Sequence, residues 1–156
     1  MKQYIWTIKV SDLLRNIWST DTIVFENKFV HNFDSVIEPG ISGEIKLQTL
    51  NKTCIQVVIS LHCTVYDISD ISWVEYTRHV KVENYETLFA TPSENWNLDK
   101  IYESFQDVYE IDPHHLIIDM EDCIINAIKS QEPIVKIKDD ENLWDWWIEV
   151  VDLPPL

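Results

Sequence analysis

Apolar and polar residues alternate over much of the first two thirds of the chain, which is typical of β-strands with one buried face. The clearest case is 44–48, with the pattern Glu-Ile-Lys-Leu-Gln, followed by a turn at Asn51-Lys52 and a β-branched segment at 54–65. Two such segments joined by a short turn predict a β-hairpin. Because alternation persists only where one face is dry, we expect these side chains to be buried: Ile45, Leu47, Val57, Ile59 and Leu61.

Three further segments, 4–10, 22–30 and 73–82, are also predicted to be extended. In 73–82 the apolar side chains share one face, which Arg78 interrupts. One face can therefore be buried and the other solvated, as antiparallel sheets allow. The apolar side chains on the shared face are Val74, Tyr76, Val80 and Val82.

Two glycines and one pair of capping residues mark breaks between these segments. Gly40 and Gly43 are typical of turns. Ser11 and Asp12 can cap a short helix over residues 13–18, because their side-chain oxygens accept hydrogen bonds from the first free N–H groups of a helix.

Helical periodicity replaces alternation in the last third of the chain. Residues 98–105 predict one or two helical turns. Asp119 can cap a longer helix over 120–130, which ends before Pro133. One stripe of this helix is apolar and is expected to pack on the sheet; it consists of Ile124, Ile125 and Ile128.

These elements predict an α+β fold, in which an antiparallel, hairpin-rich β-sheet packs against one or two helices. The chain has 156 residues, of which 46% are hydrophobic, and this is enough for one domain with a core. We assign residues 1–138 to that domain and residues 139–156 to an acidic, tryptophan-rich C-terminal tail.

The net charge of −15 is concentrated toward the C-terminus. Residues 1–93 hold 8 Lys/Arg against 11 Asp/Glu, a balance of −3, whereas residues 94–156 hold 4 against 16, a balance of −12. Such a field repels phosphates and attracts basic surfaces. Direct nucleic-acid binding needs clustered Lys/Arg, so a basic protein is the expected partner unless the acidity serves solubility alone.

The C-terminal tail joins aromatic and acidic side chains in one segment, and two interpretations stay open. Its apolar side chains fall on one helical stripe, and such a stripe can pack on its own domain. The stripe can also dock into an apolar, basic-rimmed groove of a partner, with large aromatics as anchors. In that case the contact residues are Asp139, Asp140, Glu141, Trp144, Asp145, Trp147, Ile148 and Glu149.

No pattern in the sequence predicts catalysis, a cofactor or a metal. A structural zinc site needs four Cys/His ligands, but His62 and Cys63 are neighbours on a strand and point to opposite faces. Cys63 is expected as a small buried apolar residue, and His114-His115 is expected at a solvated helix start. There is no Gly-x-Ser-x-Gly elbow and no phosphate-binding glycine loop. We therefore expect a protein that is not an enzyme.

The compartment is inferred from the cysteines and from the start of the chain. Cys54, Cys63 and Cys123 are odd in number and widely spaced, which favours a reducing compartment over a disulfide framework. The first residues lack the features of a signal peptide, and no apolar run approaches the roughly 20 residues that cross a bilayer. The expected location is the cytoplasm or an organelle stroma or matrix, including that of a plastid, and not the secreted fraction.

The order of elements also resembles a known family. Three segments resemble the YceD family, the large ribosomal RNA subunit accumulation proteins. They are a Gly-led strand from Gly43 to Leu47, a hairpin return from Val57 to Tyr66 and the strand that starts at Trp73. The family's helix ends at a proline, and residues 118–128 with Pro133 fill that place. The resemblance covers residues 5–138. The residues Asp112-Pro113 are most similar to the cyanobacterial and plastid branch.

The chain departs from the family at its cysteines. The family's Cys-x-x-Cys pair falls on Cys63 and Tyr66, so one cysteine remains, and Tyr66 is expected to fill the space as an aromatic core residue. The cysteines that the family carries after Pro133 are absent, and Ile134, Val135 and Lys136 stand there. If those cysteines bind a metal in relatives, this chain has lost the metal.

The resemblance implies a non-enzymatic ribosome-assembly factor that supports accumulation of large-subunit ribosomal RNA. Combined with the charge, it implies binding of a basic ribosomal protein, because carboxylates can stand in for the phosphates that such a protein later meets. The alternative is an accessory or structural subunit of a larger protein assembly, anchored by the acidic aromatic C-terminal region.

Overall fold

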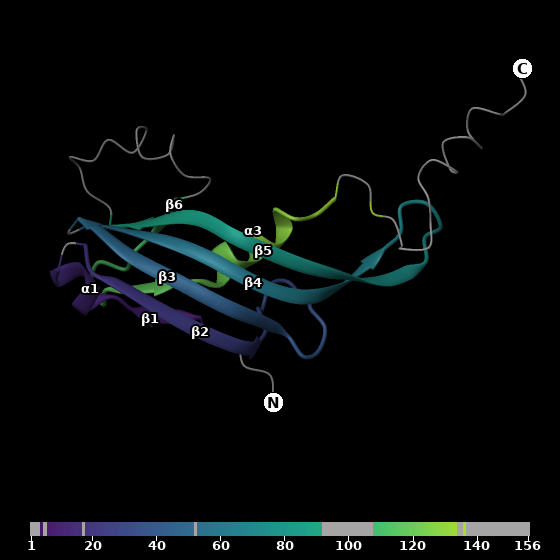
Figure 1. Cartoon of the computed structure of the whole chain (residues 1–156), viewed down its shortest axis with the longest axis horizontal. Coiled ribbons are helices and arrows are strands. Elements are labelled where there is room, and N and C mark those ends of the chain that lie inside the picture. Colours follow the sequence, from purple (N-terminus) through teal and green to yellow (C-terminus); the bar gives the residue numbers. More distant parts are fainter. Residues whose placement is uncertain are drawn as a thin grey trace, which may run out of the picture.

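A five-stranded sheet forms the main layer of the protein in the computed structural model (Figure 1). The structure describes residues 4, 6–16, 18–51, 53–91, 108–133 and 136. The strand order is β2-β3-β4-β5-β6, antiparallel except for the parallel pair β5–β6. The strands are β2 (Thr20–Lys28), β3 (Ile41–Asn51), β4 (Cys54–Ile68), β5 (Glu75–Ala90) and β6 (Val108–Glu110).

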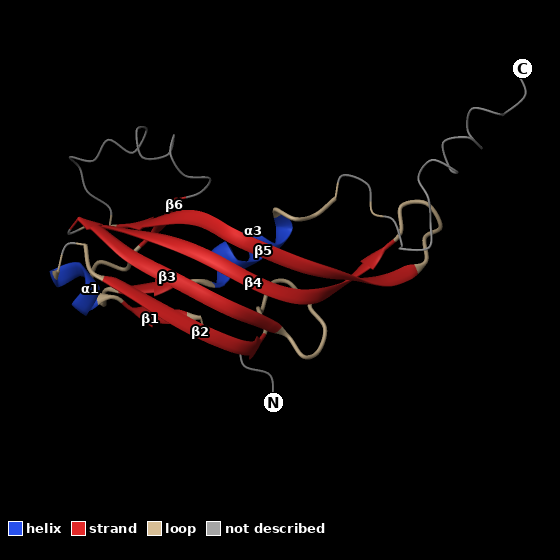
Figure 2. Cartoon of the chain, in the orientation of Figure 1, coloured by secondary structure: helices blue, strands red, loops and turns tan. Residues whose placement is uncertain are grey.

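A second layer of short strands and helices lies on one side of this sheet (Figure 2). Strands β1 (Thr7–Lys9) and β7 (Ile117–Asp119) form a two-stranded antiparallel sheet. The helices of this layer are α1 (Ser11–Arg15) and α3 (Glu121–Lys129). The predicted α+β fold is therefore confirmed.

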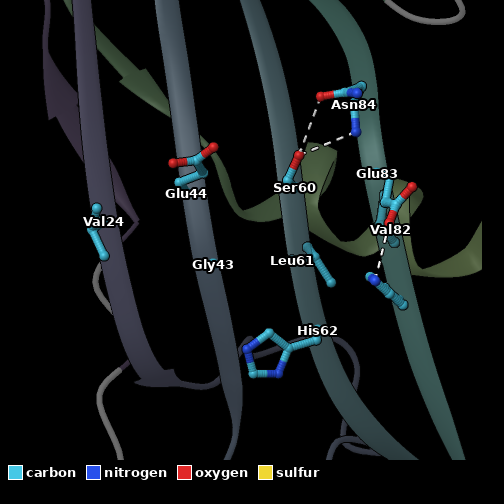
Figure 3. Close-up of a pocket in the computed structure, with 10 residues that line it drawn as sticks. Val24, Gly43, Glu44, Ser60, Leu61, His62, Val82, Glu83 and Asn84 are labelled. Carbon is cyan, nitrogen blue, oxygen red and sulfur yellow. Dashed lines mark hydrogen bonds and ion pairs between the residues drawn. The ribbon is translucent and has the colours of Figure 1, made fainter.

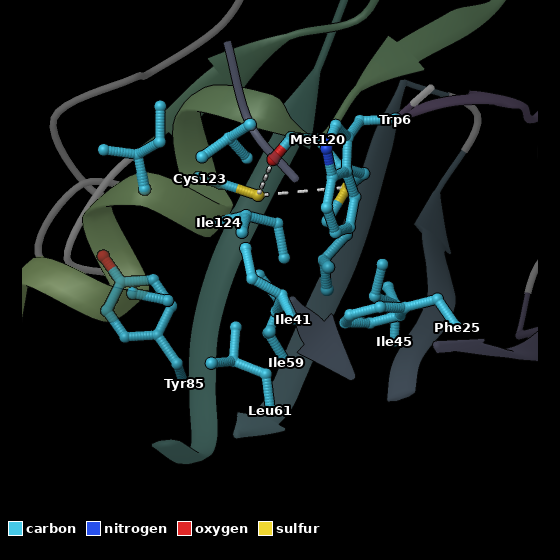
Figure 4. Packing of buried hydrophobic residues seen from close by; sticks show 14 of the residues in the cluster. Trp6, Phe25, Ile41, Ile45, Ile59, Leu61, Tyr85, Met120, Cys123 and Ile124 are labelled. Atoms are coloured by element: carbon cyan, nitrogen blue, oxygen red, sulfur yellow. Dashed lines mark hydrogen bonds between the residues drawn. The ribbon is translucent and has the colours of Figure 1, made fainter. Parts of the chain in front are cut away.

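The predicted hairpin is strands β3 and β4, in register through pairs such as Ile45 with Ile59. The five side chains predicted to be buried are at most 2% exposed. They belong to one core cluster with Trp6, which precedes β1, with Phe25 of β2, and with Met120 and Ile124 at the start of the α3 segment. Figure 4 shows Ile45, Ile59 and Leu61 in this cluster. Alternation thus located the buried face correctly, because one side of the sheet is covered by the second layer.

The predicted long helix is α3, whose apolar stripe is buried as expected. A carboxylate oxygen of Asp119 accepts a hydrogen bond from the N–H of Glu121 at 3.0 Å. This satisfies one of the free N–H groups at the start of the helix. The buried side chains of α3 are Cys123, Ile124, Ile125, Ala127 and Ile128.

Two local predictions near the N-terminus were wrong. The short helix begins at Ser11 itself and ends at Arg15, and Trp18 has a left-handed φ of 69°, which a right-handed helix cannot include. Gly43 is not in a turn: it lies inside β3, paired with Leu61 of β4. Gly40, with a φ of 103°, does lie in a turn, as expected.

Strand β5 begins and ends later than predicted. It runs from Glu75 to Ala90, through an irregularity opposite Ile59 to Leu61 of β4. Tyr76, Val80 and Val82 are buried as expected, whereas Val74 precedes the strand and is 47% exposed. The predictions for residues 98–105 and for the tail at 139–156 lie outside the described residues.

Candidate protein-binding surface at the β4–β5 hairpin

The β4–β5 hairpin extends beyond the strand that flanks it. Strand β3 pairs with β4 only as far as His62, whereas β4 and β5 stay paired up to Ile68 and Glu75. In Figure 1 these two strands run on, to the right of the view, past the rest of the sheet. We call residues 66–76 the hairpin tip. Within this tip Ser69 and Tyr76 are buried, whereas four large apolar side chains are exposed.

The turn of the hairpin tip is held by hydrogen bonds to the buried Ser69. Its hydroxyl oxygen accepts hydrogen bonds from the N–H groups of Ile71, at 3.2 Å, and Ser72, at 3.3 Å. The N–H of Trp73 donates to the carbonyl oxygen of Ser69, and the N–H of Ser69 donates to that of Val74, both at 3.0 Å. The backbone of the turn is therefore well defined, including the left-handed φ of 62° at Trp73.

Large apolar side chains gather at the hairpin tip without being covered. Trp73 is 78% exposed, Val74 47%, Ile68 45% and Tyr66 37%. Only two other large hydrophobic side chains in the described part of the chain are exposed, Trp18 and Val24. Single exposed apolar residues are ordinary, but a group of them at one place is typical of an interaction site.

An ion-pair cluster lies on the opposite side of the same hairpin arm. Asp67 accepts a hydrogen bond from Arg78 Nε at 3.1 Å and forms an ion pair with Lys136 Nζ at 3.0 Å. Arg78 also donates to the carbonyl oxygen of Gln131 at 3.3 Å. We call Asp67, Arg78 and Lys136 the Asp67 clasp. The hydrogen bond to Asp67 raises the pKa of Lys136.

The Asp67 clasp brings the chain after α3 back to the hairpin tip. The backbone N–H of Asp70 donates to the carbonyl oxygen of Lys136, and the N–H of Lys136 donates to the Asp70 carboxylate, both at 2.7 Å. Residue 136 is therefore fixed to the tip by two hydrogen bonds and an ion pair. The acidic tail starts three residues further along the chain, at Asp139.

The tail residues predicted to contact a partner lie outside the described residues, so their contacts stay a prediction. The hairpin tip was not predicted as a site. Ile68, Trp73 and Val74 stand on both sides of a Ser/Asp-rich turn in the sequence, but this pattern does not tell whether another layer covers them.

The two residues at the family's cysteine positions are separated by the sheet. Cys63 is buried, as expected, with 3% exposure, and burial raises the pKa of its thiol to about 11, which the positive charge of Arg78 partly opposes. His62 is exposed on the other face, as strand geometry requires. The expectation that Tyr66 fills core space was wrong, because it lies on the exposed face and hydrogen-bonds with Glu75, which raises its pKa.

The histidine pair His114-His115 is not at a helix start, contrary to expectation. It lies in a turn between β6 and β7, where the Asp112 carboxylate accepts hydrogen bonds from both backbone N–H groups. Asp112 also contacts the His115 ring at 2.9 Å, and these hydrogen bonds lower the pKa of Asp112. Within the described ranges, no three Cys, His, Asp or Glu side chains are grouped to hold a metal ion.

The sheet also carries a shallow groove of about 550 Å³ on its solvent-facing side (Figure 3). Its floor lies over Gly43 and Leu61, and Ser60 closes one side by hydrogen bonds with Asn84. The Lys81–Glu83 ion pair at 3.0 Å forms part of its rim. Glu44 also lines the groove and forms an ion pair with Lys46 at 3.6 Å. Because the charged groups of the groove are paired within the chain, it offers less to a charged partner than the hairpin tip does.

Comparisons with protein-family models, curated proteins and solved structures found no match. In the described part of the chain, no helix combines the length and the apolar character needed to cross a membrane.

Proposed function

We propose that this protein is a non-enzymatic ribosome-assembly factor that supports accumulation of large-subunit ribosomal RNA by binding a basic ribosomal protein. The observation that carries the proposal is the attachment of Lys136 to the hairpin tip through Asp67 and Asp70. Lys136 stands three residues before an acidic, tryptophan-rich segment in the sequence. Acidic and aromatic groups close together in a chain suit a partner with cationic and apolar groups.

The charge of the tail supports a cationic partner. Residues 137–156 hold one Lys/Arg and six Asp/Glu. Charges of one sign accelerate the encounter with an oppositely charged protein and orient it, whereas desolvated aromatic side chains supply most of the affinity. The tail contains both kinds of group within a short stretch.

The cations in the folded part offer little to a nucleic acid. Eight Lys/Arg residues are described, and five of them form ion pairs with carboxylates of this chain. A phosphate backbone would have to displace those carboxylates before it could bind. This favours the ribosomal protein over the ribosomal RNA as the direct partner. The five are Arg15, Lys46, Arg78, Lys81 and Lys136.

The test is a titration of the purified full chain against individual basic large-subunit ribosomal proteins and against naked ribosomal RNA at physiological salt. We expect binding of a basic protein and weak binding of RNA.

Trp147→Ala should cost about 2 kcal/mol of binding free energy, as the loss of an anchor residue does. Neutralising Asp139, Asp140 and Glu141 to the amides should lower the association rate and weaken its salt dependence.

Two results would contradict the proposal. One is tight RNA binding with no protein partner, and the other is a chain without residues 139–156 that binds as the full chain does. Co-purification with a complex that contains no ribosomal protein would favour the accessory-subunit alternative instead.

A further inference from the structure

We propose that the hairpin tip is itself a docking surface, in which Trp73 and Val74, supported by Ile68, enter an apolar pocket of a basic protein partner. This inference rests on the proposed function, from which the basic charge of the partner is taken. It assigns the central contact to the β4–β5 hairpin, whereas the tail residues 139–149 were the predicted contact.

Exposure is the first argument. Trp73 is 78% exposed at the end of a protruding hairpin, so its indole projects outward and forms a convex surface. A convex apolar group of this kind fits a concave apolar surface on a partner, where it is desolvated on binding. Tryptophan is also the residue most enriched among the anchors of protein interfaces.

The rigidity of the turn is the second argument. Ser69 receives two N–H donors on its side chain and exchanges two backbone hydrogen bonds with Trp73 and Val74. These bonds hold Trp73 at a φ of 62°, a conformation that bulky residues rarely adopt. A tip that is ordered before binding loses less entropy when it binds, and uncommon backbone conformations are concentrated at binding sites.

Charge selects the partner. The two cations near the tip, Arg78 and Lys136, are both directed to Asp67. Asp70 and Glu75 flank the apolar side chains and have no ion pair with a cation in the described part of the chain. The tip is therefore an apolar surface with an acidic border, and its occupant should carry an apolar pocket bordered by Lys or Arg.

The experiment compares two exposed tryptophans of the full-length chain. Trp18 and Trp73 are 67% and 78% exposed, and both have a left-handed φ, of 69° and 62°. Asparagine tolerates this conformation, so Trp73→Asn and Trp18→Asn are matched variants that keep the backbone. Each is titrated against the same individually purified basic large-subunit ribosomal proteins, and thermal unfolding checks that each remains folded.

We expect Trp73→Asn to weaken binding about 30-fold, as removal of an interface anchor does, and Trp18→Asn to leave it within about twofold. Unchanged binding by Trp73→Asn, with binding still weakened by neutralising residues 139–141, would overturn the docking surface and leave the proposed function intact. A wild-type chain that binds none of these proteins would overturn both. Trp73-dependent self-association, measured by light scattering, would assign the surface to a second copy and overturn the basic partner.

Discussion

Gly43 illustrates how one residue is fixed by the packing of its neighbours rather than by its own conformation. Its φ is not left-handed, yet a Cβ atom placed on it would lie 2.1 Å from the carbonyl oxygen of Ser60 and 2.7 Å from the Cα of Leu61. The sequence suggested a turn because glycine is typical of turns. Only the register of β3 against β4 reveals the close approach of two backbones, which glycine alone permits.

Gly43→Ala is therefore expected to destabilise the protein by about 1–3 kcal/mol, the usual cost of forcing an added carbon into packed structure. The matched control is Gln48→Ala, a substitution on the same strand at a partly exposed position, which should change stability by less than about 0.5 kcal/mol. Urea unfolding of the two variants measures both effects. Equal midpoints for Gly43→Ala and the wild type would mean that the two strands can separate at no cost.

Exposure of single residues was predictable where the sheet continues and not where it ends. Ile45, Leu47 and Ile59 were placed correctly because alternation along a covered sheet fixes which face is dry. Val74 was placed on the buried face by the same rule, but it precedes strand β5 and is 47% exposed, whereas Tyr66 was placed in the core by the family resemblance and lies on the solvent-facing side with His62. Alternation reports the two faces of a strand and contains no information on how far the covering layer extends.

At the scale of elements, the β3–β4 hairpin and α3 were predictable because each has a strong local signal. Short elements were not predictable. Helix α1 has only five residues, and the residue at its N-cap is Val10, which makes no side-chain capping hydrogen bond. The Asp67 clasp could not be predicted either, since it joins β4, β5 and residue 136 across a long sequence separation. Contacts of this kind depend on topology, which the local pattern does not encode.

Asp67→Asn tests whether the clasp fixes residue 136 to the hairpin. The side chains of Asp67 and Arg78 are 12% and 17% exposed, so losing the charge should cost about 1–3 kcal/mol, the range for hydrogen bonds to charged groups. Glu83→Gln is the control, because the Lys81–Glu83 pair is 69% and 68% exposed and should contribute less than about 1 kcal/mol.

Hydrogen exchange supplies the local readout for the same pair of variants. In Asp67→Asn the amide protons of Asp70 and Lys136, which hydrogen-bond across the clasp, should exchange faster, whereas Glu83→Gln should leave them protected. Unchanged protection in Asp67→Asn would mean that the backbone hydrogen bonds alone hold residue 136.

At the scale of the whole molecule, net charge and its asymmetry were readable from the sequence, and the basic partner that we propose is inferred from them. What they could not supply is the place where the acidic segment joins the fold. The structure supplies part of the answer at Lys136, three residues before the tail in the sequence, which is held at the hairpin tip by Asp67 and Asp70. The acidic charge of the proposed binding region could therefore be predicted from the sequence, whereas the location of the hairpin tip could not.

The stability of the whole protein is expected to fall at alkaline pH. Burial raises the pKa of Cys63 from 9.0 to about 11. Burial also raises the pKa of Tyr76, whose hydroxyl has no hydrogen-bond partner among the described residues. The hydrogen bond to Asp67 raises the pKa of Lys136. Each group binds its proton more tightly in the folded state. Its contribution to stability is therefore complete below the pKa of the unfolded chain and is lost as pH rises through the folded pKa.

Urea midpoints measured between about pH 8 and pH 11 should therefore decrease, beginning near the ordinary thiol pKa of 9.0. Cys63→Ala lowers stability at neutral pH because it leaves a small cavity, but it removes the titrating thiol, so its midpoint should decrease less steeply over the same interval than that of the wild type. Asp112, whose pKa is lowered, keeps its contribution to stability throughout the neutral and alkaline range and loses it only as pH falls below its ordinary value of 3.8, so it adds no slope to the alkaline measurement. A wild-type midpoint that is constant up to about pH 11 would show that Cys63 keeps the same proton affinity when the chain unfolds, and its burial would then have no energetic consequence.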